Sequence, residues 1–465
     1  MGYLTGFKDK SIVVLGAGVT GLSCLRFLYA HGLSFVVNDS RTMPLADEEE
    51  VRAYQEEFPL VTFEFGQWQS DLIAQADIII TSPGIDLAAE GIEQIISPEC
   101  VVLGDIELFC LVNNENHQPM KILAVTGSNG KSTVVTLLHY LAKQLGIHAA
   151  LAGNIGEPIL ELLLLEASEQ PDYLIVELSS FQLETLTSMQ AIAASVLNLS
   201  DDHLDRHKTL ANYQALKQSI YQQANIAVVN REDAATVTLV KEQEVMSFGL
   251  DKPENGQFGL AEVDHEPCLM FGKERLITLN QLPLAGMHNA LNYMAALALG
   301  LCAGWPLTGM VNKLNGFKGL AHRCQRIETR DGIHWINDSK ATNVGATIAA
   351  LAGLAPTIPH NKRLILIAGG DGKGADFEPL KASLTEHVSQ LITLGKDGAE
   401  IASLVVNAIE VDSLVAAVQQ AKNIAKAGDM VLLSPACASI DMFKNFMVRG
   451  EVFVAAVQAE EGPCL

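Results

Sequence analysis

The sequence predicts an α/β protein divided into three domains. Three stretches of the chain repeat one pattern, in which a short apolar strand runs into a polar or glycine-rich loop and then into a helical pattern. The chain has 465 residues, and a single hydrophobic core rarely grows beyond about 250–300 residues. Polar or glycine-rich breaks occur at 111–120 and near 316–319, which predicts domains over residues 1–112, 113–318 and 319–465.

The N-terminal stretch carries a glycine loop between a strand and a helix. The expected strand Ser11–Leu15 is followed by Gly16, Gly18 and Gly21, and a second expected strand, Ser34–Val37, is followed closely by Asp39. Asp39 lies 18 residues after Gly21, close to the roughly 20 residues of a dinucleotide-binding fingerprint. The pattern predicts a Rossmann-like domain that holds a pyrophosphate, either that of NAD in an oxidoreductase or that of another nucleotide such as a UDP-sugar.

A second phosphate-binding loop begins at Thr126. It follows the expected strand Lys121–Val125, reads TGSNGKS through Ser132, and precedes an amphipathic helical pattern that Gly146 closes. In this arrangement backbone N–H groups and the helix dipole face an anion, the lysine of the loop reaches the terminal phosphates, and Ser132 can hold Mg²⁺. The middle domain is therefore expected to be of the P-loop ATPase type. An oxidoreductase has no need for a second phosphate cradle, so this loop argues against that alternative.

Acidic and histidine side chains follow the strands of the middle domain. Glu177 ends the apolar run that starts at Tyr173, and a dense cluster at 201–207 (DDHLDRH) follows an expected strand over Ser195–Leu199. Carboxylates at the carboxyl end of a strand beside a phosphate loop suit a metal or phosphate site. For His203 taken alone, an ordinary hydrogen-bonded histidine is the more common arrangement.

The C-terminal stretch has three polar loops at expected strand ends. They are Asp338–Asn343, Gly369–Lys373 and Ser434–Ser439. In a parallel sheet such loops line one crevice, so together they predict a binding site. Cys437 lies in the third loop, but no general base can be assigned to it, and a packing role is expected.

Composition narrows the classes of function. The formal charge of −23, from 31 basic and 54 acidic residues, disfavours nucleic acid and anionic membrane as partners. The eight cysteines are scattered without a CxxC pair, which is typical of a reducing compartment. No signal peptide and no apolar stretch of membrane-spanning length is present. We expect a cytoplasmic monomer that acts on small molecules.

Several segments resemble the Mur ligases. In the middle of the chain these are TGSNGKST (126–133), AGNIG (152–156), VELSSFQLE (176–184), DDHLDRH (201–207) and GMHNALN (286–292). INDSKATN (336–343) and GGDGKGADF (369–377) resemble the C-terminal domain of that family. TSPGI (81–85), GDIELF (104–109) and SPACASIDMFKNFMVRG (434–450) are similar to the branch that adds D-glutamate. The departures are His207, where related enzymes often carry an aromatic residue, and the loop around 250–275.

The resemblance implies an ATP-dependent amide ligase of peptidoglycan synthesis, with a UDP-binding domain, an ATPase domain and a Rossmann-like C-terminal domain. ATP would phosphorylate the carboxylate of UDP-N-acetylmuramoyl-L-alanine, and the amine of D-glutamate would attack the acyl-phosphate, with two Mg²⁺ ions as cofactors. A Mur ligase that adds another amino acid, or a folylpolyglutamate synthase, remains an alternative. The N-terminal glycine loop argues against the folate enzyme, whose chain starts with the ATPase domain.

The resemblance also implies roles for individual residues. Catalysis would involve Lys131, Glu177, His203, Lys217 and Lys340. ATP would contact Gly127, Ser128, Asn129, Gly130, Lys131, Ser132, Thr133, Asn289, Arg323 and Asp338. The UDP-substrate would contact Gly18, Thr20, Asp39, Ser40, Arg41, Gly84, Asn154 and His203. D-glutamate would contact Thr342, Lys373, Ser439, Ile440 and Phe446. The metal ligands would be Ser132, Glu177, His203 and Lys217 as a carbamate.

Lys217 is expected to be carbamylated on its ε-amine. It lies in an expected helix over Asn212–Gln222, with Tyr213 four residues before it and Tyr221 four residues after it on the same face. Burial on that face lowers a lysine pKa and leaves a neutral amine that can take up carbon dioxide. From the residues alone, a lysine that extends its ammonium to solvent is more common. The resemblance favours the carbamate, an oxygen ligand of the kind that Mg²⁺ prefers.

Overall fold

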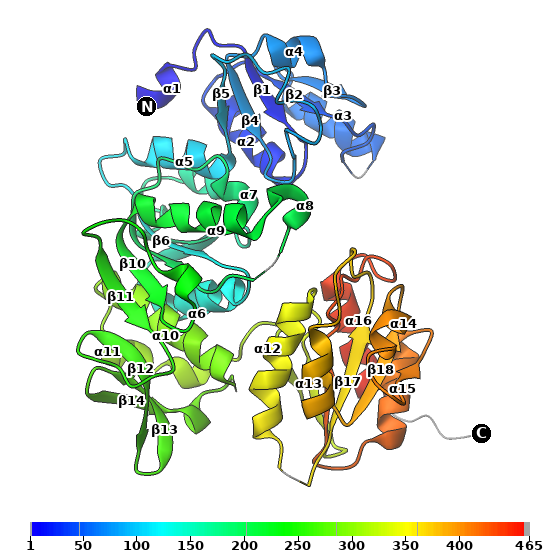
Figure 1. Cartoon of the computed structure of the whole chain (residues 1–465). Helices are drawn as coiled ribbons and strands as arrows, with labels where there is room; N and C mark the ends of the chain where they lie inside the picture. Colours follow the sequence, from blue (N-terminus) through cyan, green and yellow to red (C-terminus); the bar gives the residue numbers. More distant parts are fainter. Residues whose placement is uncertain (1, 46, 201, 285, 360, 460–465) are drawn as a thin grey trace. The chain divides into compact units, whose positions relative to one another are not determined.

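The computed structural model describes residues 2–45, 47–200, 202–284, 286–359 and 361–459. Contacts divide the chain into two compact units. The first unit contains the chain up to Ala261 with Met270–Leu276 and Tyr293–Lys313, and the second contains Glu262–Leu269, Ile277–Asn292 and the chain from Leu314 onward. The expected α/β class is confirmed, since parallel strands alternate with helices in both units (Figure 1). The domain boundaries at 112/113 and 318/319 stay predictions.

The first unit begins with a five-stranded parallel sheet in the order β3-β2-β1-β4-β5. Its strands are β1 (Ile12–Leu15), β2 (Val36–Asp39), β3 (Thr62–Phe65), β4 (Ile78–Thr81) and β5 (Val101–Leu103). The helices are α1 (Gly2–Thr5), α2 (Val19–Ala30), α3 (Glu48–Glu57), α4 (Ser70–Ala74) and α5 (Asp105–Asn113). The switch in strand order on either side of β1 opens a crevice at the carboxyl ends of β1 and β4, where ligands bind in such sheets.

A second sheet has the order β14-β13-β12-β11-β10-β9-β6-β8-β7. Its strands are β6 (Lys121–Thr126), β7 (Ala149–Gly153), β8 (Tyr173–Glu177), β9 (Ala191–Val196), β10 (Ala224–Asn230), β11 (Glu244–Phe248), β12 (Gln257–Val263), β13 (Glu266–Phe271) and β14 (Glu274–Thr278). Its α-helices are α6 (Lys131–Gln144), α7 (Ser180–Leu183), α8 (Leu204–His207), α9 (Leu210–Gln218), α10 (Met287–Cys302) and α11 (Leu307–Val311). Short 3₁₀ turns are η1 (Ile159–Leu163), η2 (Ser219–Gln223), η3 (Ala234–Thr236), η4 (Leu279–Gln281) and η5 (Leu314–Gly316). The central strands β8, β6 and β9 are parallel and bring their carboxyl ends together.

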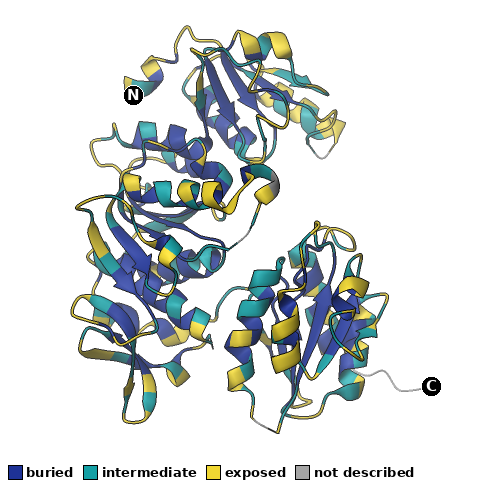
Figure 2. Cartoon of the chain, in the orientation of Figure 1, coloured by how far each residue is buried: buried dark blue, intermediate teal, exposed yellow. Residues whose placement is uncertain are grey.

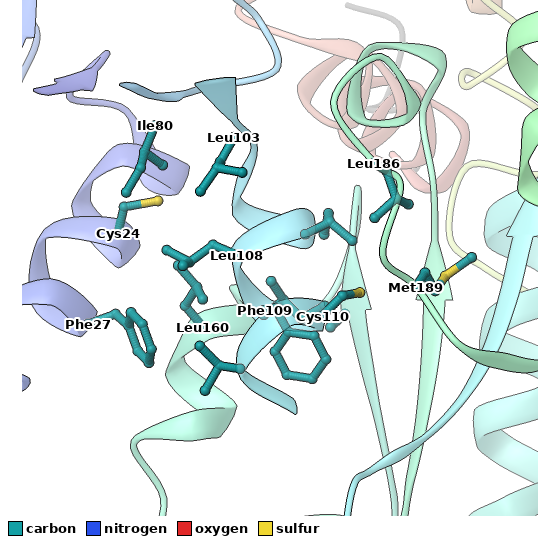
Figure 3. Close-up of a cluster of buried hydrophobic side chains, with 14 of the residues drawn as sticks. Cys24, Phe27, Ile80, Leu103, Leu108, Phe109, Cys110, Leu160, Leu186 and Met189 are labelled. Atoms are coloured by element: carbon teal, nitrogen blue, oxygen red, sulfur yellow. The ribbon is translucent and has the colours of Figure 1, made fainter. Parts of the chain in front are cut away.

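One hydrophobic core runs through both sheets of the first unit. Helix α5 packs against η1, and buried side chains from α2, β4, β5 and α5 join residues of the middle stretch. Figure 3 shows part of this cluster: Cys24, Phe27, Ile80, Leu103, Leu108, Phe109, Cys110, Leu160, Leu186 and Met189. The two phosphate loops predicted from the sequence therefore belong to one packed body.

The second unit contains a six-stranded sheet in the order β15-β16-β20-β17-β18-β19. The strands are β15 (Gln325–Ile327), β16 (His334–Asn337), β17 (Leu364–Gly369), β18 (Gln390–Leu394), β19 (Ile409–Glu410) and β20 (Met430–Leu433). Its helices are α12 (Val344–Leu354), η6 (Ala355–Thr357), α13 (Leu380–His387), α14 (Gly398–Ala402), α15 (Leu414–Ile424) and α16 (Phe446–Gln458). The strands β16, β20 and β17 are adjacent and parallel, so the three polar loops predicted to share a crevice follow neighbouring strands.

The central strands are buried, edge strands such as β3 are only partly buried, and the outer helix faces are exposed, as Figure 2 shows. This pattern agrees with the apolar runs of the sequence, because strands covered on both faces read as continuous apolar segments. In the described residues, no helix is long and apolar enough to cross a membrane.

Three expected elements differ from the structure. The strand expected over Ser195–Leu199 is β9 (Ala191–Val196), because small alanines with weak strand propensity fit between β6 and β10. The strand expected to end at Val37 continues to Asp39, since the Asn38 side chain donates to the carbonyls of Glu64 and Gln67. The helix expected over 212–222 ends at Gln218 and continues as η2.

Candidate active site

Six of the eight residues predicted to contact the UDP-substrate line one cavity of about 380 Å³. The cavity lies at the carboxyl ends of β1, β2 and β4, and these six residues are Gly18, Thr20, Asp39, Ser40, Arg41 and Gly84. Helix α2 begins after Gly18 without a side-chain cap. Its first N–H groups are therefore not satisfied by a capping side chain and suit an anion.

Asp39 is the charged centre of this cavity. Its carboxylate is 3% exposed and accepts hydrogen bonds from the backbone N–H of Ala17 at 2.8 Å and from the Arg41 guanidinium. Burial opposes ionisation, but the hydrogen bonds from Arg41 and Ala17 outweigh it and lower the pKa of the carboxyl. Asp39 is thus held as an anion that orders the loop.

Ser82 was not among the predicted residues, although it lines the same cavity. Its Oγ is buried, and no described residue forms a hydrogen bond with it. Gly16 lies against it with φ +91°, and a Cβ at that glycine would be 2.8 Å from the hydroxyl. The sequence signal was available, since Ser82 follows strand β4 directly in the TSPGI segment.

The P-loop connects β6 to α6 and has the predicted strand–loop–helix geometry. Gly130 adopts φ +84° as the N-cap of α6, with no side-chain cap, and Ser132 and Thr133 are buried in the first turn. The Lys131 ammonium donates to the carbonyls of Gly127 at 2.7 Å and Ser128 at 2.9 Å. The Lys131 side chain therefore folds back over its own loop. It is predicted to hold the terminal phosphates of ATP at this position.

Asn198 and Ser200, which the sequence did not single out, brace the P-loop. The Asn198 amide exchanges hydrogen bonds with the backbone of Asn129 at 2.8 and 3.0 Å, and the Ser200 N–H donates to the Ser128 hydroxyl. Gly127 has φ +138°, and a Cβ there would be 3.1 Å from the backbone nitrogen of Leu197. The segment after β9 thus fixes the loop from outside it.

Glu177 is the buried carboxylate beside the P-loop. It ends β8, is 1% exposed, and receives a hydrogen bond on Oε1 from the Asn154 amide at 2.8 Å. Its Oε2 is buried, and no described residue donates to it. A buried carboxylate oxygen without a donor is costly unless a cation meets it. This oxygen therefore fits a metal ion, and Asn154 orients the carboxylate rather than lining the N-terminal cavity.

Lys217 is buried beside the P-loop. It is 1% exposed, its ammonium donates to the Thr126 hydroxyl at 3.0 Å, and it lies 4.9 Å from the centre of the Tyr213 ring. Burial lowers its pKa well below the ordinary value, and the nearby charge of Lys131 acts in the same direction. The environment therefore favours the neutral amine that carbamylation needs.

His203 lies at the start of α8 in an exposed position, with φ +53°. Its ring packs 4.7 Å from that of Phe181, and the imidazole is 3.7 Å from the Asp202 carboxylate. His207, the residue that departs from the family pattern, is buried with Nε2 2.9 Å from the Ser180 hydroxyl. Asp201 lies outside the described residues, so the cluster at 201–207 is described only in part.

In the second unit the three strand-end loops meet. Asp338 after β16 accepts from the Ser434 hydroxyl at 2.9 Å, and Asp371 and Ala438 pair through their backbones. Burial raises the pKa of Asp338 to about 6, although the hydrogen bonds from Ser434 and Cys324 act in the opposite direction. Cys437 is fully buried, and burial raises the pKa of its thiol to about 12, which agrees with the packing role.

Three of the five predicted D-glutamate residues, Thr342, Lys373 and Ser439, lie in these loops, and Ile440 and Phe446 follow the third loop. The Lys340 ammonium lies 3.9 Å from the centre of the Phe446 ring, and the Phe446 carbonyl accepts from the Ser339 hydroxyl. Ser439 is buried, whereas Lys373 and Ile440 are exposed and Thr342 is partly buried just before α12. Besides Asp338, two further predicted ATP contacts belong to this unit: Asn289, buried in the first turn of α10, and Arg323, just before β15.

Three family models match the chain. They are the MurD-like N-terminal domain of Mur ligases over residues 10–104, the Mur ligase middle domain over 125–300, and the Mur ligase glutamate ligase domain over 322–437. A UDP-N-acetylmuramoylalanine--D-glutamate ligase of Colwellia psychrerythraea is 68% identical, over 100% of this chain and 100% of that protein. The chain belongs to the Mur ligase family. The resemblance drawn from the motifs is confirmed.

Other relatives and solved structures agree with this family. The enzymes of the same name from Pseudomonas savastanoi and Shewanella oneidensis are 43% and 42% identical, covering 97% and 98% of this chain and 98% and 99% of theirs. The fold is similar to MurF of Acinetobacter baumannii (TM-score 0.61, 17% identity, 97% of this chain and 91% of that chain). It is also similar to UDP-N-acetylmuramate-alanine ligase MurC of Thermotoga maritima (TM-score 0.58, 18% identity, 97% and 99%). The three-domain architecture of Mur ligases is therefore the architecture of this chain.

Proposed function

We propose that this Mur ligase joins D-glutamate to UDP-N-acetylmuramoyl-L-alanine at the expense of ATP, in peptidoglycan synthesis. The observation that carries the proposal is the full-length similarity to ligases named for D-glutamate. The site agrees with it, because the first unit contains two separate phosphate cradles, one at Gly18 and one at Gly130. A ligase that binds both a UDP-linked substrate and ATP needs two such cradles.

The proposed reaction proceeds in two steps. A carboxylate oxygen of the L-alanyl group attacks the γ-phosphorus of ATP, the bond to the bridging oxygen breaks, and ADP leaves. The amine of D-glutamate, having lost a proton, then attacks the acyl carbon, and phosphate leaves as the amide forms. Both partners of the first step are anions, so Lys131 at the P-loop is proposed to screen them.

The donor set beside the P-loop fits Mg²⁺. Among the residues that the structure describes, no three His, Cys, Asp or Glu side chains cluster as a ready metal site. We propose mixed oxygen and nitrogen ligands instead: Ser132, the unpaired Oε2 of Glu177, His203, and Lys217 as a carbamate. When bound, the metal would neutralise charge on the phosphates. Asn154 would keep the Glu177 carboxylate directed at it.

The amino-acid acceptor is assigned to the loops of the second unit. Lys373 is an exposed cation, and the buried Ser439 follows β20, where backbone N–H groups and a hydroxyl can meet carboxylates. We assign the reaction to the cytoplasm, where small soluble precursors are made. The free state of every described cysteine supports a reducing compartment.

A phosphate-release assay tests the proposal. The whole chain is supplied with UDP-N-acetylmuramoyl-L-alanine, Mg²⁺ and ATP, and phosphate release is measured with D-glutamate, L-glutamate or a diamino acid, with product mass as confirmation. We expect release and product with D-glutamate alone. Equal rates with L- and D-glutamate, or release only with a diamino acid, would overturn the assignment of the acceptor.

A further inference from the structure

Arg206 on helix α8 joins the two sheets of the first unit. Its Nη1 donates to the carbonyl of Pro83 at 2.9 Å and its Nη2 to the carbonyl of Ile85 at 3.1 Å. Those two carbonyls flank Gly84, which lines the cavity proposed for the UDP-substrate. One guanidinium therefore holds both ends of the peptide segment that contacts that substrate.

The same guanidinium is also held by residues of helix α7 and of the C-terminal end of that helix. The Glu184 carboxylate accepts from Nε at 3.0 Å and also from Nη2, and the guanidinium carbon lies 4.4 Å from the centre of the Phe181 ring. The Arg206 side chain is only 12% exposed. Because Nε, Nη1 and Nη2 all donate, the orientation of the group is set by partners on two elements.

Arg206 is also tied directly to His203. The backbone N–H of Arg206 donates to the His203 carbonyl at 3.1 Å, since the two residues share the single turn of α8. The rings of Phe181 and His203 are 4.7 Å apart, so Phe181 contacts both the arginine and the histidine. A displacement of the Gly84 segment therefore moves His203, because the Arg206 side chain and the single turn of α8 connect the two.

We infer that Arg206 is a positioning residue that couples occupancy of the UDP-substrate cavity to the position of His203. The inference rests on the proposed function, which makes His203 a ligand of the metal that accompanies ATP. Substrate bound at the Gly84 segment fixes the Pro83 and Ile85 carbonyls, and Arg206 transmits that order to the turn carrying His203. The consequence is that the two substrates bind cooperatively.

A planar guanidinium is required for this role. Its rigid fork of donors spans two carbonyls and a carboxylate together, whereas a lysine ammonium is a compact charge on a flexible stem. Arg206→Lys thus keeps the charge and loses the bridge. If Arg206 contributed only a positive charge near Asp86 or Glu184, a lysine at position 206 would restore the coupling.

The chain offers a matched control in Arg26. It also links the N-terminal sheet to the middle stretch, through Nε to Glu161 at 2.7 Å and Nη1 to the Tyr54 hydroxyl at 3.3 Å. Among the described residues, its side-chain hydrogen bonds go to α3 and η1 and to neither the Gly84 segment nor α8. Arg26→Ala removes an ion pair between the same two parts without touching the proposed connection.

Calorimetric titration measures the coupling directly. UDP-N-acetylmuramoyl-L-alanine is titrated into the whole chain with and without a saturating Mg²⁺ complex of a non-hydrolysable ATP analogue, and the ratio of the two Kd values is the coupling factor. We expect about tenfold for the unmodified chain and for Arg26→Ala, within the usual range for linked sites. Arg206→Ala and Arg206→Lys should both fall to about twofold or less.

Thermal unfolding of each variant shows whether it is folded. If Arg206→Ala is unfolded, the coupling factor of Arg206→Lys decides the test. Unchanged coupling in the folded Arg206 variant, equal loss in Arg26→Ala, or full rescue by lysine would overturn the inference. So would an unmodified chain that binds both ligands without coupling. If the unmodified chain binds the ATP analogue but not the UDP-substrate, the proposed function itself fails, and this inference falls with it.

Discussion

The two loops of the first unit that are proposed to hold phosphate, the two cradles, share a plan and differ in their charges. Each is a parallel strand, a glycine loop and a helix whose N-terminus lacks a side-chain cap, at Gly18 for α2 and at Gly130 for α6. The N-terminal loop is ordered by a buried anion, Asp39, whereas the P-loop contains a lysine and lies beside an unpaired carboxylate oxygen of Glu177. Two other helices of the chain begin differently: α3 and α15 are capped by the side chains of Asp47 and Ser413.

This difference in charge suits the first cradle to holding a phosphate and the second cradle to a reaction at a phosphate. The Asp39 carboxylate in the first cradle repels phosphate unless hydrogen-bond donors outweigh the repulsion. The position near Asp39 therefore suits a neutral group such as a ribose hydroxyl, and the N-terminus of the helix suits the diphosphate. A cation and a carboxylate proposed to bind metal in the second cradle suit a phosphoryl group that gains charge during transfer. The predictions below remove one feature at a time from one cradle and ask whether the other is unaffected.

Replacing Lys131 with alanine should have the largest effect. Loss of one charge-stabilising donor in a transition state typically costs at least about 100-fold in kcat, and we expect phosphate release to fall by at least that factor. Binding of the UDP-substrate should be unchanged in calorimetry. Lys143→Ala, which removes an exposed lysine in the last turn of the same helix, is the control and should be fully active. Near-normal release by Lys131→Ala would show that the P-loop assignment is wrong.

Replacing Lys217 with alanine should be nearly as severe, because a metal ligand would be lost. We expect about a 100-fold decrease in activity, partly restored by added acetate, whose carboxylate can occupy the position of the carbamate. The control is the exposed Lys241, whose replacement by alanine should leave activity unaffected with or without acetate.

The carbamate itself is measurable. Carbon-13 NMR after equilibration with labelled bicarbonate should give a carbamate signal in the unmodified chain and none in Lys217→Ala. An active Lys217→Ala enzyme, or an unmodified lysine in a metal-loaded crystal, would contradict the assignment.

Asp39→Asn should affect only the first cradle. The amide keeps one acceptor oxygen but loses the charge-assisted bonds from Arg41 and Ala17, which are each worth roughly 1.5–3 kcal/mol. We expect about tenfold weaker binding of the UDP-substrate and, at a saturating concentration of that substrate, an unchanged KM for ATP. Asp77→Asn tests the other end of the same sheet, where the carboxylate accepts from the Ser11 N–H, and should leave both constants unchanged. A KM for ATP that is raised even at a saturating concentration of the UDP-substrate would mean that Asp39 acts on the second cradle itself and not only through the coupling by Arg206.

The choice of nucleotide in the first cradle is expected to give the smallest signal, because a bare nucleotide makes only part of the substrate's contacts. Titration of the whole chain with UDP should give weak saturable binding that Asp39→Asn weakens further. NAD should not bind. Tight NAD binding would return the oxidoreductase to consideration.

The sequence predicted the parts of this site that are local in the chain. The P-loop, the glycine loop and Glu177 follow strands directly, so strand periodicity and glycine spacing locate them. Lys217 was predicted to be buried from the spacing of Tyr213 and Tyr221, and all three side chains are buried. The apolar pattern of the helix face suggested burial, but from the residues alone an ammonium extended to solvent was the more common arrangement, and the resemblance to the Mur ligases decided the prediction.

The contacts that brace the site are not local and could not be predicted in this way. Arg206 meets Pro83 and Ile85 across 123 and 121 residues, and Asn198 meets Asn129 across 69. Arg206 was noted only as a member of the cluster at 201–207 and Asn198 was not noted at all, because an arginine or asparagine in a loop is usually solvated and its distant partners leave no mark in the local sequence. The position of β9 was missed for a related reason, since packing between β6 and β10 outweighed the weak strand propensity of its alanines.

The central claim, that the ligase activates a carboxylate as an acyl-phosphate, is tested most directly by oxygen-18 transfer. UDP-N-acetylmuramoyl-L-alanine labelled in both carboxylate oxygens is incubated with the whole chain, Mg²⁺, ATP and D-glutamate, and the released phosphate and the amide product are analysed by mass spectrometry. An acyl-phosphate intermediate places one labelled oxygen in each phosphate released and leaves one in the carbonyl of each new amide. Unlabelled phosphate accompanying amide formation would contradict it.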